Sequence, residues 1–390
     1  MVRLNQQLLD PTRSGREAEQ LETSLRSKII GQDQAIRQIV SVYQTFLAGM
    51  NSPGRPVGNF LFLGPTGTGK TRMVEATAES LVGDARAVIK IDCAEFQHSH
   101  EIAKLIGSPP GYLGHRETHP ALGQDALNRY HTENLKLSFV LFDEIEKASD
   151  ALWNLLLGVL DKGTLTLGDN RQVDFSRCII FMTSNLGASE MASILKPGLG
   201  FAPPPDSSEP VPASLAEKVS RAGMEAARRK FSPEFINRID KIVAFQPLDE
   251  SELRRVLDLE LGVLRRRFAD SSQGTPFVLS VTGRAKGYLL QEGTDIRYGA
   301  RPLKRAIERS LVHPMSSLIA TGQVRLGDWI RVDFDPELRH LTFYKDAEDV
   351  ALAEMAALAS ASTEQPAPAM AVVAPAQSSR AAKVRSIRSI

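Results

Sequence analysis

Short apolar runs alternate with helical segments from Ile29 to about Leu248. The runs NFLFLG, AVIKID, SFVLFD and CIIFMTS are typical of strands that are covered on both faces. Segments such as RMVEATAESLV between them have the spacing of helices. This alternation predicts an α/β fold, in which a mostly parallel sheet is covered by helices.

The pattern changes after Pro247, where helical segments combine with the short strands PFVLSVT, DWIRVDF and HLTFYK. We therefore expect a separate small α+β domain, with Asp249 capping its first helix. The parts expected from the pattern are a leader and helix over residues 1–27, a large domain over 28–247, a small domain over 248–346 and a disordered tail over 347–390. A loop over residues 195–214, rich in proline, glycine and serine, is expected to be mobile.

Composition excludes several classes of function. Lysine and arginine (47) nearly balance aspartate and glutamate (46), so the net charge of +1 gives no electrostatic signature for nucleic acid or anionic membrane. Neither a signal peptide nor an apolar run long enough to cross a membrane is found. The two cysteines, Cys93 and Cys178, lie in apolar runs, which suits buried thiols in a reducing compartment. We expect a cytoplasmic protein with no nucleic-acid or membrane partner.

One glycine-rich segment carries the strongest chemical signal. It follows the apolar run NFLFL, opens a helix and fits the full phosphate-loop pattern. Its residues are Gly64, Pro65, Thr66, Gly67, Thr68, Gly69, Lys70 and Thr71. Backbone N–H groups would surround the β-phosphate, Lys70 would meet the β- and γ-phosphates, and Thr71 would bind Mg²⁺. The predicted cofactors are ATP and Mg²⁺.

Two carboxylates follow the apolar run FVLF and fit the same chemistry. Asp143 would hold Mg²⁺ through water, and Glu144 would act as general base on the attacking water. The alternative for this pair is a strand that simply ends in solvent. Asn185, after the run CIIFMTS, could be offered to the same water. Arg238 and Arg301, each at the edge of a predicted helix, could reach a phosphate. The residue types alone leave these three undistinguished from ordinary surface positions.

Eight segments together carry a resemblance to a known family. IIGQDQAI, FLFLGPTGTGKT, GSPPGYLG, VLFDEIEKA, LLLGVLDKGTLT, IFMTSNLG, FSPEFINRIDKIV and YGARPLKRAIE occur in the order found in Clp-type AAA+ protein unfoldases. The chain resembles the second, C-terminal ATPase module of ClpA, ClpB and ClpC with its lid domain, over about residues 20–335. The resemblance implies an ATP hydrolase that unfolds or remodels protein substrates.

The resemblance also implies roles for individual residues. Ile29 and Ile30 would line the adenine pocket, Asn185 would sense the γ-phosphate, and Arg301 would be the second sensor in the lid. Arg238 would be an arginine finger offered to a neighbouring subunit, which implies a homo-oligomeric ring, in this family a hexamer. On the sequence given, we expect a single ring without a separate recruiting domain.

The resemblance also implies a function for two further segments. Gly111, Tyr112, Leu113 and Gly114 match the aromatic pore loop that grips an unfolded polypeptide, although the residues after them, His115 to His119, depart from the family pattern. Leu199, Gly200 and Phe201 resemble the tripeptide that docks onto a Clp-type peptidase. An assembly switch or scaffold that remodels a partner without threading stays open as an alternative. The histidines near Tyr112 fit no zinc spacing.

Overall fold

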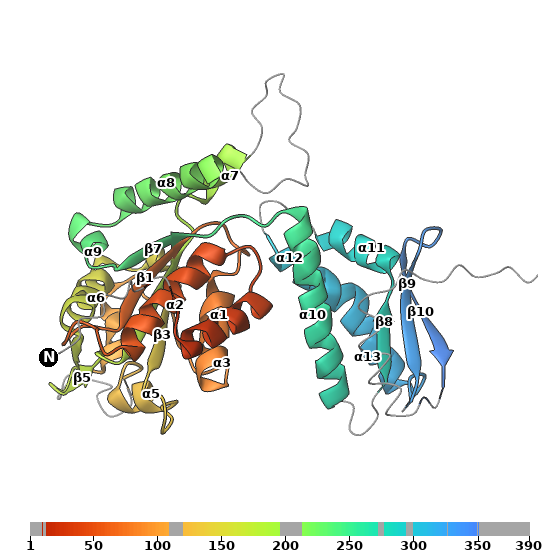
Figure 1. The fold of residues 1–390 in the computed structure, drawn as a ribbon, viewed down its shortest axis with the longest axis horizontal. Coiled ribbons are helices and arrows are strands. Elements are labelled where there is room, and N and C mark those ends of the chain that lie inside the picture. The colour runs from red at the N-terminus through yellow and green to blue at the C-terminus, as the bar shows by residue number, and fades with distance from the viewer. Residues whose placement is uncertain are drawn as a thin grey trace, which may run out of the picture.

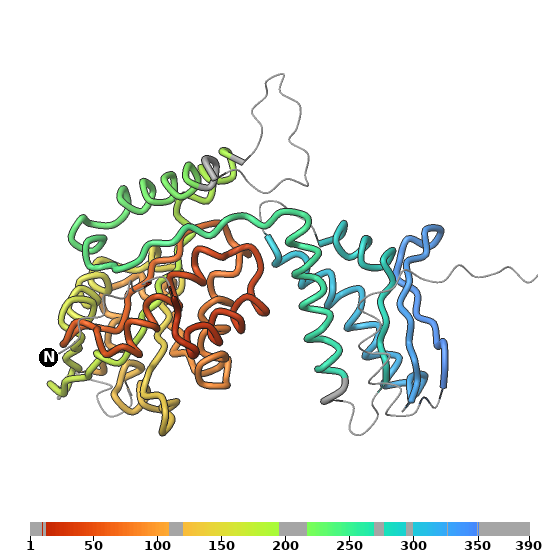
Figure 2. The backbone as a smooth tube through the Cα atoms, viewed as in Figure 1, coloured from red at the N-terminus to blue at the C-terminus, as the bar shows by residue number. Residues whose placement is uncertain are grey.

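The computed structural model describes residues 10, 13–108, 120–195, 213–271, 277–293, 299–325, 327–348 and 350. They form two α/β bodies, each with its own sheet, and the chain passes once from β7 of the larger body to α10 of the smaller (Figures 1 and 2). The predicted pore-loop segment 111–114, the tripeptide 199–201 and, within the predicted tail 347–390, residues 349 and 351–390 lie outside the described residues.

The larger sheet is parallel throughout, with the strand order β2-β3-β6-β1-β7. Its strands are β1 (Gly58–Leu63), β2 (Ile89–Asp92), β3 (Ser138–Asp143), β6 (Cys178–Ser184) and β7 (Lys241–Ala244). The four apolar runs of the sequence form the first four of these strands, so the predicted parallel sheet is confirmed. β7 is a short edge strand, and its residues were not among the apolar runs identified in the sequence.

Side chains of the central strands alternate between two cores, as successive residues of a strand must. In β1, Phe60 and Phe62 pack with α1 (Arg16–Lys28), α2 (Asp33–Leu47) and α3 (Lys70–Val82), whereas Leu61 and Leu63 pack on the opposite side. That side is covered by α6 (Asp150–Lys162), α7 (Ala188–Leu195), α8 (Ala213–Lys230) and α9 (Pro233–Asn237). Burial on both faces explains why the strands are apolar without interruption.

Short elements fill the connections of the larger body. They are η1 (Cys93–Glu95), η2 (Ser99–Ile102), α4 (Ala103–Ile106), α5 (Gln124–Asn128), η3 (Ile145–Lys147) and the antiparallel hairpin of β4 (Thr164–Thr166) and β5 (Gln172–Asp174). Of these, η3 follows β3 directly. It therefore places the residues after Asp143 at the carboxyl edge of the sheet.

The smaller body has a three-stranded mixed sheet packed against helices around a third core. Its elements are α10 (Glu250–Ser271), β8 (Val278–Val281), α11 (Gly283–Gly293), α12 (Arg301–Ile307), η4 (Glu308–Val312), α13 (His313–Ala320), β9 (Trp329–Asp335) and β10 (His340–Ala347). Asp249 caps α10 as predicted, because its carboxylate accepts from the Glu252 N–H at 2.7 Å. The Glu252 carboxylate accepts in turn from the Asp249 N–H at 2.9 Å.

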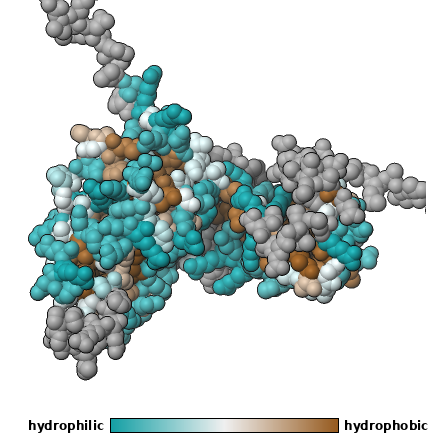
Figure 3. Space-filling view, turned by 90° about the horizontal axis from the view of Figure 1, so that it is seen from below, coloured by the Kyte–Doolittle hydropathy of each residue, from teal (hydrophilic) through white to brown (hydrophobic). Residues whose placement is uncertain are grey.

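Both cysteines are buried and unpaired, in agreement with the expectation from the sequence. Burial raises the pKa of the Cys178 thiol to about 12 and raises that of Cys93 as well. On the face shown in Figure 3, hydrophobic atoms form separate patches within a mostly hydrophilic surface. Within the described part of the chain, no helix is both long enough and apolar enough to span a bilayer.

Candidate nucleotide-binding site

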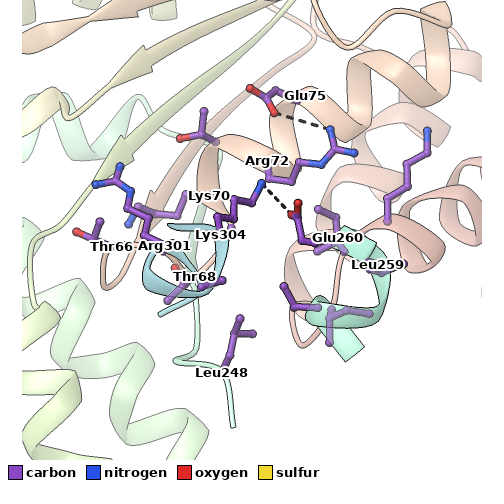
Figure 4. A pocket seen from close by; sticks show the side chains of 18 of the residues that line it. Thr66, Thr68, Lys70, Arg72, Glu75, Leu248, Leu259, Glu260, Arg301 and Lys304 are labelled. Carbon is purple, nitrogen blue, oxygen red and sulfur yellow. Dashed lines mark ion pairs between the residues drawn. The ribbon is translucent and has the colours of Figure 1, made fainter. Parts of the chain in front are cut away.

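A cavity of about 840 Å³ lies where the carboxyl edge of the larger sheet meets α10 and α12 of the smaller body (Figure 4). It gathers most of the site residues predicted from the sequence. Those that line it are Ile29, Ile30, Thr66, Gly67, Thr68, Gly69, Lys70, Thr71, Asp143, Glu144, Asn185 and Arg301. Parallel strands end at one edge of a sheet, and this brings β1, β3 and β6 to the same cavity.

The phosphate loop has the backbone that its glycines predict. Gly64, Gly67 and Gly69 have φ values of 140°, 80° and 97°, in the region that residues with a Cβ avoid. A Cβ on Gly64 would also lie 2.6 Å from the Phe245 carbonyl oxygen, so the residue after β7 packs directly against the loop. α3 begins at Lys70, which leaves the N–H groups of its first turn free to bind an anion.

Lys70 is held firmly although it carries a charge. Its Nζ donates to the carbonyl oxygens of Gly64 (2.7 Å) and Pro65 (2.9 Å) and to Oδ1 of Asn185 (3.1 Å). The side chain is only 8% exposed, and this burial lowers the pKa of the Lys70 ammonium to about 8. A cation fixed in this way beside the loop is ready to meet a phosphate.

Thr71 and Asp143 together offer the oxygen ligands that Mg²⁺ prefers. The Thr71 hydroxyl donates to Asp143 Oδ2 at 3.3 Å, and the Thr183 hydroxyl donates to Asp143 Oδ1. The described residues contain no group of three or more histidine, cysteine, aspartate or glutamate side chains arranged around a common point.

Glu144 adopts a left-handed backbone conformation, with φ of 56°, which costs a residue with a side chain about 1 kcal/mol or more. Its N–H donates to the Thr183 hydroxyl at 3.1 Å, which holds this turn. The carboxylate pairs with Lys147 and accepts from Asn185 Nδ2 at 3.4 Å. The hydrogen bond from Lys147 lowers the pKa of Glu144, so the carboxylate is ionised, as a general base requires.

Asn185 links three parts of the site. Its side-chain oxygen accepts from Lys70 and, at 3.4 Å, from the Thr66 hydroxyl, while its amide nitrogen donates to Glu144. Its own N–H donates to Glu146 Oε1 at 3.1 Å. Sequence reasoning did not single out Glu146 or Lys147, although both lie in the quoted segment VLFDEIEKA.

The smaller body supplies the opposite wall of the cavity. Gly299 has φ of 58°, and a Cβ there would lie 2.7 Å from the Gly67 carbonyl oxygen. The next residue, Ala300, donates its N–H to the same oxygen at 3.1 Å. Arg301 therefore enters the cavity at the start of α12, as Figure 4 shows. Lys304 also lies on this wall and pairs with Glu260 at 2.8 Å.

The walls also meet at an apolar end of the cavity. Ile29 and Ile30 lie there with apolar side chains of the linker and α10, namely Leu248, Val256, Leu259 and Val263. An apolar lining of this kind suits a purine base. The neighbouring Gln32, 4% exposed, donates to the carbonyl oxygens of Thr68 (3.3 Å) and Gln246 (2.9 Å) and accepts from the Gln246 N–H (3.2 Å). It ties the phosphate loop to the linker, a contact that the sequence did not reveal.

Arg238 is the one predicted site arginine that does not line the cavity. It is the C-cap of α9, and its Nη1 donates to Asp161 Oδ1 at 2.7 Å. A second cavity of about 550 Å³ adjoins the first, since Asp143, Glu144 and Arg301 line both. The reacting end of a nucleotide would thus be open on a side away from the base.

Comparisons with known proteins agree with this geometry. The family model of the AAA domain (Cdc48 subfamily) matches residues 55–242, and that of the C-terminal, D2-small domain of ClpB protein matches residues 248–332. The chain belongs to the Clp-type AAA+ ATPases. The predicted resemblance is therefore confirmed, together with the predicted ATPase class.

Named relatives show the same relationship. The chaperone protein ClpB of Streptomyces albus G is 41% identical over 315 residues, which cover 80% of this chain and 33% of that protein. The ATP-binding subunit ClpC of the ATP-dependent Clp protease of Staphylococcus saprophyticus is 37% identical over 315 residues, 81% of this chain and 36% of ClpC. The chain thus spans about a third of the length of the curated relatives it matches.

Solved structures of Hsp104 are similar in fold as well. Hsp104 with ATPγS and FITC-casein in the closed state gives a TM-score of 0.69 at 30% identity, over 84% of this chain and 52% of that one. The extended complex of Saccharomyces cerevisiae Hsp104 with casein gives 0.71 at 29% identity, over 85% and 53%. Both alignments extend beyond the larger sheet into the smaller body, since each covers more than four-fifths of this chain.

Proposed function

We propose that this chain hydrolyses ATP at the subunit interfaces of a hexameric ring and uses the cycle to unfold protein substrates threaded through the pore. The observation that carries the proposal is the division of the charged groups. Lys70, Asp143, Glu144 and Arg301 converge on one cavity, whereas Arg238 lies off it. One subunit would thus provide every charged group of its ATP site except the arginine finger. Hydrolysis between subunits requires this arrangement, because the finger then comes from a neighbouring subunit.

Each group of the cavity then has a role in the reaction. The phosphate loop and Lys70 bind the phosphates, and Ile29 and Ile30 hold the adenine against the linker and α10. Glu144 accepts a proton from the attacking water, and Asn185 orients that water while contacting Lys70. Thr71 and Asp143 would hold Mg²⁺, which supplies charge neutralisation at the phosphates when bound. Arg301 contacts the nucleotide from the smaller body and acts as the second sensor.

We assign residues 28–247 and 248–346 to the large and small subdomains of this ATPase. The backbone contact of Ala300 with Gly67 and the linker contacts of Gln32 support the assignment, because they let the smaller body respond to the phosphate loop. Cytoplasmic location belongs to the same proposal and is supported by the two unpaired thiols.

Action on polypeptides is supported by the relatives, two of which are named as a chaperone and as the ATP-binding subunit of a protease, and by casein in the Hsp104 complexes. Tyr112 between Gly111 and Gly114 is the proposed gripping residue, since an aromatic ring holds a chain by apolar contact without regard to sequence. Docking of a Clp-type peptidase at Leu199–Phe201 belongs to the same proposal and is supported by the resemblance of these residues to the docking tripeptide of the family.

The deciding experiment measures ATP-driven unfolding of a fluorescent substrate protein by the Tyr112→Ala and Tyr112→Phe variants. We expect Tyr112→Ala to keep ATP binding, assembly and basal hydrolysis while unfolding falls to background. Tyr112→Phe is the matched control and should keep most of the activity, because grip needs the ring and not the hydroxyl. If Tyr112→Ala unfolds the substrate at the wild-type rate, the threading proposal fails and a remodelling switch replaces it.

A further inference from the structure

Arg238 forms an ion pair at the surface, and hydrogen bonds also fix the backbone around this pair. The guanidinium and the Asp161 carboxylate are 37% and 35% exposed, and a single 2.7 Å hydrogen bond from Nη1 to Oδ1 joins them. An isolated pair at such exposure contributes little to stability. The contacts beneath the pair, however, fix the backbone on both sides of it.

Those contacts come from Asn59, a polar residue in the otherwise apolar strand β1 that is only 1% exposed. Its Nδ2 donates to the carbonyl oxygen of Arg238 and to that of Leu160, the residue before Asp161, at 3.4 Å each. One buried amide therefore joins α6 to the end of α9 at the point where the ion pair forms. These two contacts satisfy Nδ2, whereas Oδ1 of Asn59 has no hydrogen-bond partner among the described residues. Because an unpaired buried amide group is costly, moving the two backbones apart would leave Nδ2 unpaired as well.

The backbone of Asn59 adds to this link. Its N–H donates to Asp240 Oδ2 at 2.9 Å, and its carbonyl oxygen accepts from the Asp240 N–H at 3.1 Å. The segment from Arg238 to Asp240 is thus attached to β1 by side chain and main chain together. The base of the Arg238 side chain is anchored to the central sheet, and only the guanidinium end is left to Asp161.

We propose that Asp161 and Asn59 are positioning residues that hold Arg238 in the orientation in which it reaches the nucleotide of a neighbouring copy. This inference rests on the proposed function, in which Arg238 acts between subunits. Asp161 accepts from one nitrogen and leaves the remaining N–H groups of the guanidinium for a phosphate. Asn59 sets the distance between the backbones that carry the pair.

The size of the effect follows from the entropy of the arginine side chain. Ordering a side chain with many rotamers upon association costs roughly a factor of two to ten in the equilibrium constant. An arginine that Asp161 has already ordered avoids much of this cost when the transition state forms. Loss of Asp161 should therefore slow hydrolysis by about that factor, far less than loss of the arginine itself.

The experiment compares Asp161→Ala, Asp161→Asn and Arg238→Ala in the full chain, with titration of a fluorescent ATP analogue and steady-state hydrolysis. We expect nucleotide affinity to stay within about twofold for all three, because neither residue lines the ATP cavity. Turnover should fall by about two- to tenfold for Asp161→Ala and less for Asp161→Asn, which keeps an oxygen that can accept from Nη1. Glu190→Ala is the matched control, since Glu190 pairs with Arg229 at 3.0 Å away from the cavity and should leave turnover unchanged.

A double variant separates positioning from a general loss of structure. If Asp161 acts only through Arg238, then Asp161→Ala combined with Arg238→Ala is no slower than Arg238→Ala alone. Losses that multiply in the double variant, or wild-type turnover in Asp161→Ala, would overturn the inference. If Arg238→Ala itself turns over at the wild-type rate, the finger of the proposed function fails instead, so the two failures can be told apart.

Asn59→Ala tests the second positioning residue, with a melting curve to establish that the variant is folded. We expect retained affinity for the ATP analogue, reduced turnover, and no further reduction in the Arg238→Ala background. A folded Asn59→Ala variant with wild-type turnover would remove Asn59 from the proposal. Should this variant not fold, the inference is decided by Asp161→Ala, Asp161→Asn and the double variant of Asp161→Ala with Arg238→Ala.

Discussion

The two walls of the nucleotide cavity differ in how their charged groups are held. On the wall of the larger sheet, Lys70 is buried with three hydrogen-bond acceptors, and Asp143 and Asn185 are each bonded to neighbouring strands or loops. On the wall of the smaller body, Arg301 is exposed and Lys304 pairs with Glu260 at the surface. The first wall fixes its groups before a nucleotide arrives, while the second depends on a few backbone contacts for its place.

The largest effect on nucleotide binding should come from the fixed wall. We expect Lys70→Ala to weaken ATP binding by about a hundredfold or more, because a hydrogen bond to a charged partner contributes about 1.5–3 kcal/mol and Lys70 meets more than one phosphate oxygen. Lys304→Ala, the corresponding change on the opposite wall, should weaken binding less than about tenfold. Titration with a fluorescent ATP analogue measures both. Equal losses for the two lysines would remove the distinction between the walls.

Glu144→Gln should sharpen the comparison by separating binding from chemistry. The variant keeps the shape of the side chain but cannot accept the proton of the attacking water, so we expect normal affinity and turnover lower by about 10²–10⁴-fold. Single-turnover hydrolysis of bound ATP is the measurement. Turnover near the wild-type rate would show that another group is the general base.

Arg301→Ala probes the exposed wall. Because Arg301 lines the cavity from the smaller body and is exposed, we expect affinity to change by a few-fold and turnover to fall by about 10–100-fold, the size of one charge-assisted hydrogen bond. Steady-state kinetics over a range of ATP concentrations separates the two. A loss of affinity as large as that of Lys70→Ala would mean that both walls are fixed in advance.

The smallest effect is expected at the first turn of α10. Burial raises the pKa of Glu252, so the folded protein binds this proton more tightly than the unfolded chain, and stability falls as the pH rises through the raised pKa. Glu252→Gln removes the buried charge and keeps an acceptor for the Asp249 N–H. We expect a melting temperature higher by about 1–2 °C at neutral pH, for a change of roughly 0.5 kcal/mol.

The pH profile supplies the control for Glu252→Gln. Below the ordinary glutamate pKa of about 4.3 the wild-type side chain is neutral in both states, so the difference between the two proteins should vanish there. At every pH, the Glu252→Gln variant should have the same ATP turnover as the wild-type protein. A stabilisation that is independent of pH would show that the charge of Glu252 is not its cause.

The sequence predicted what depends on local chemistry. The phosphate loop, the acids after β3 and the parallel strands can be recognised because each needs a particular run of residues. Contacts between distant segments could not be predicted in this way. Gln32 and Gln246 are 214 positions apart, and Arg238 and Asp161 are 77 apart, so only the folded chain brings them together. β7 was missed because a short edge strand has too weak an apolar pattern.

The burial of Cys93 and Cys178 has a practical consequence for following the smaller body in solution. Thiol-reactive dyes attack the thiolate, and both native sulfurs are shielded and hard to ionise. A dye pair could therefore be attached at new cysteines without first removing the native ones. Met50, which is 76% exposed in the larger body, and Leu338, which is 61% exposed in the smaller, offer accessible positions for energy-transfer measurements of the distance between the two bodies with and without ATP.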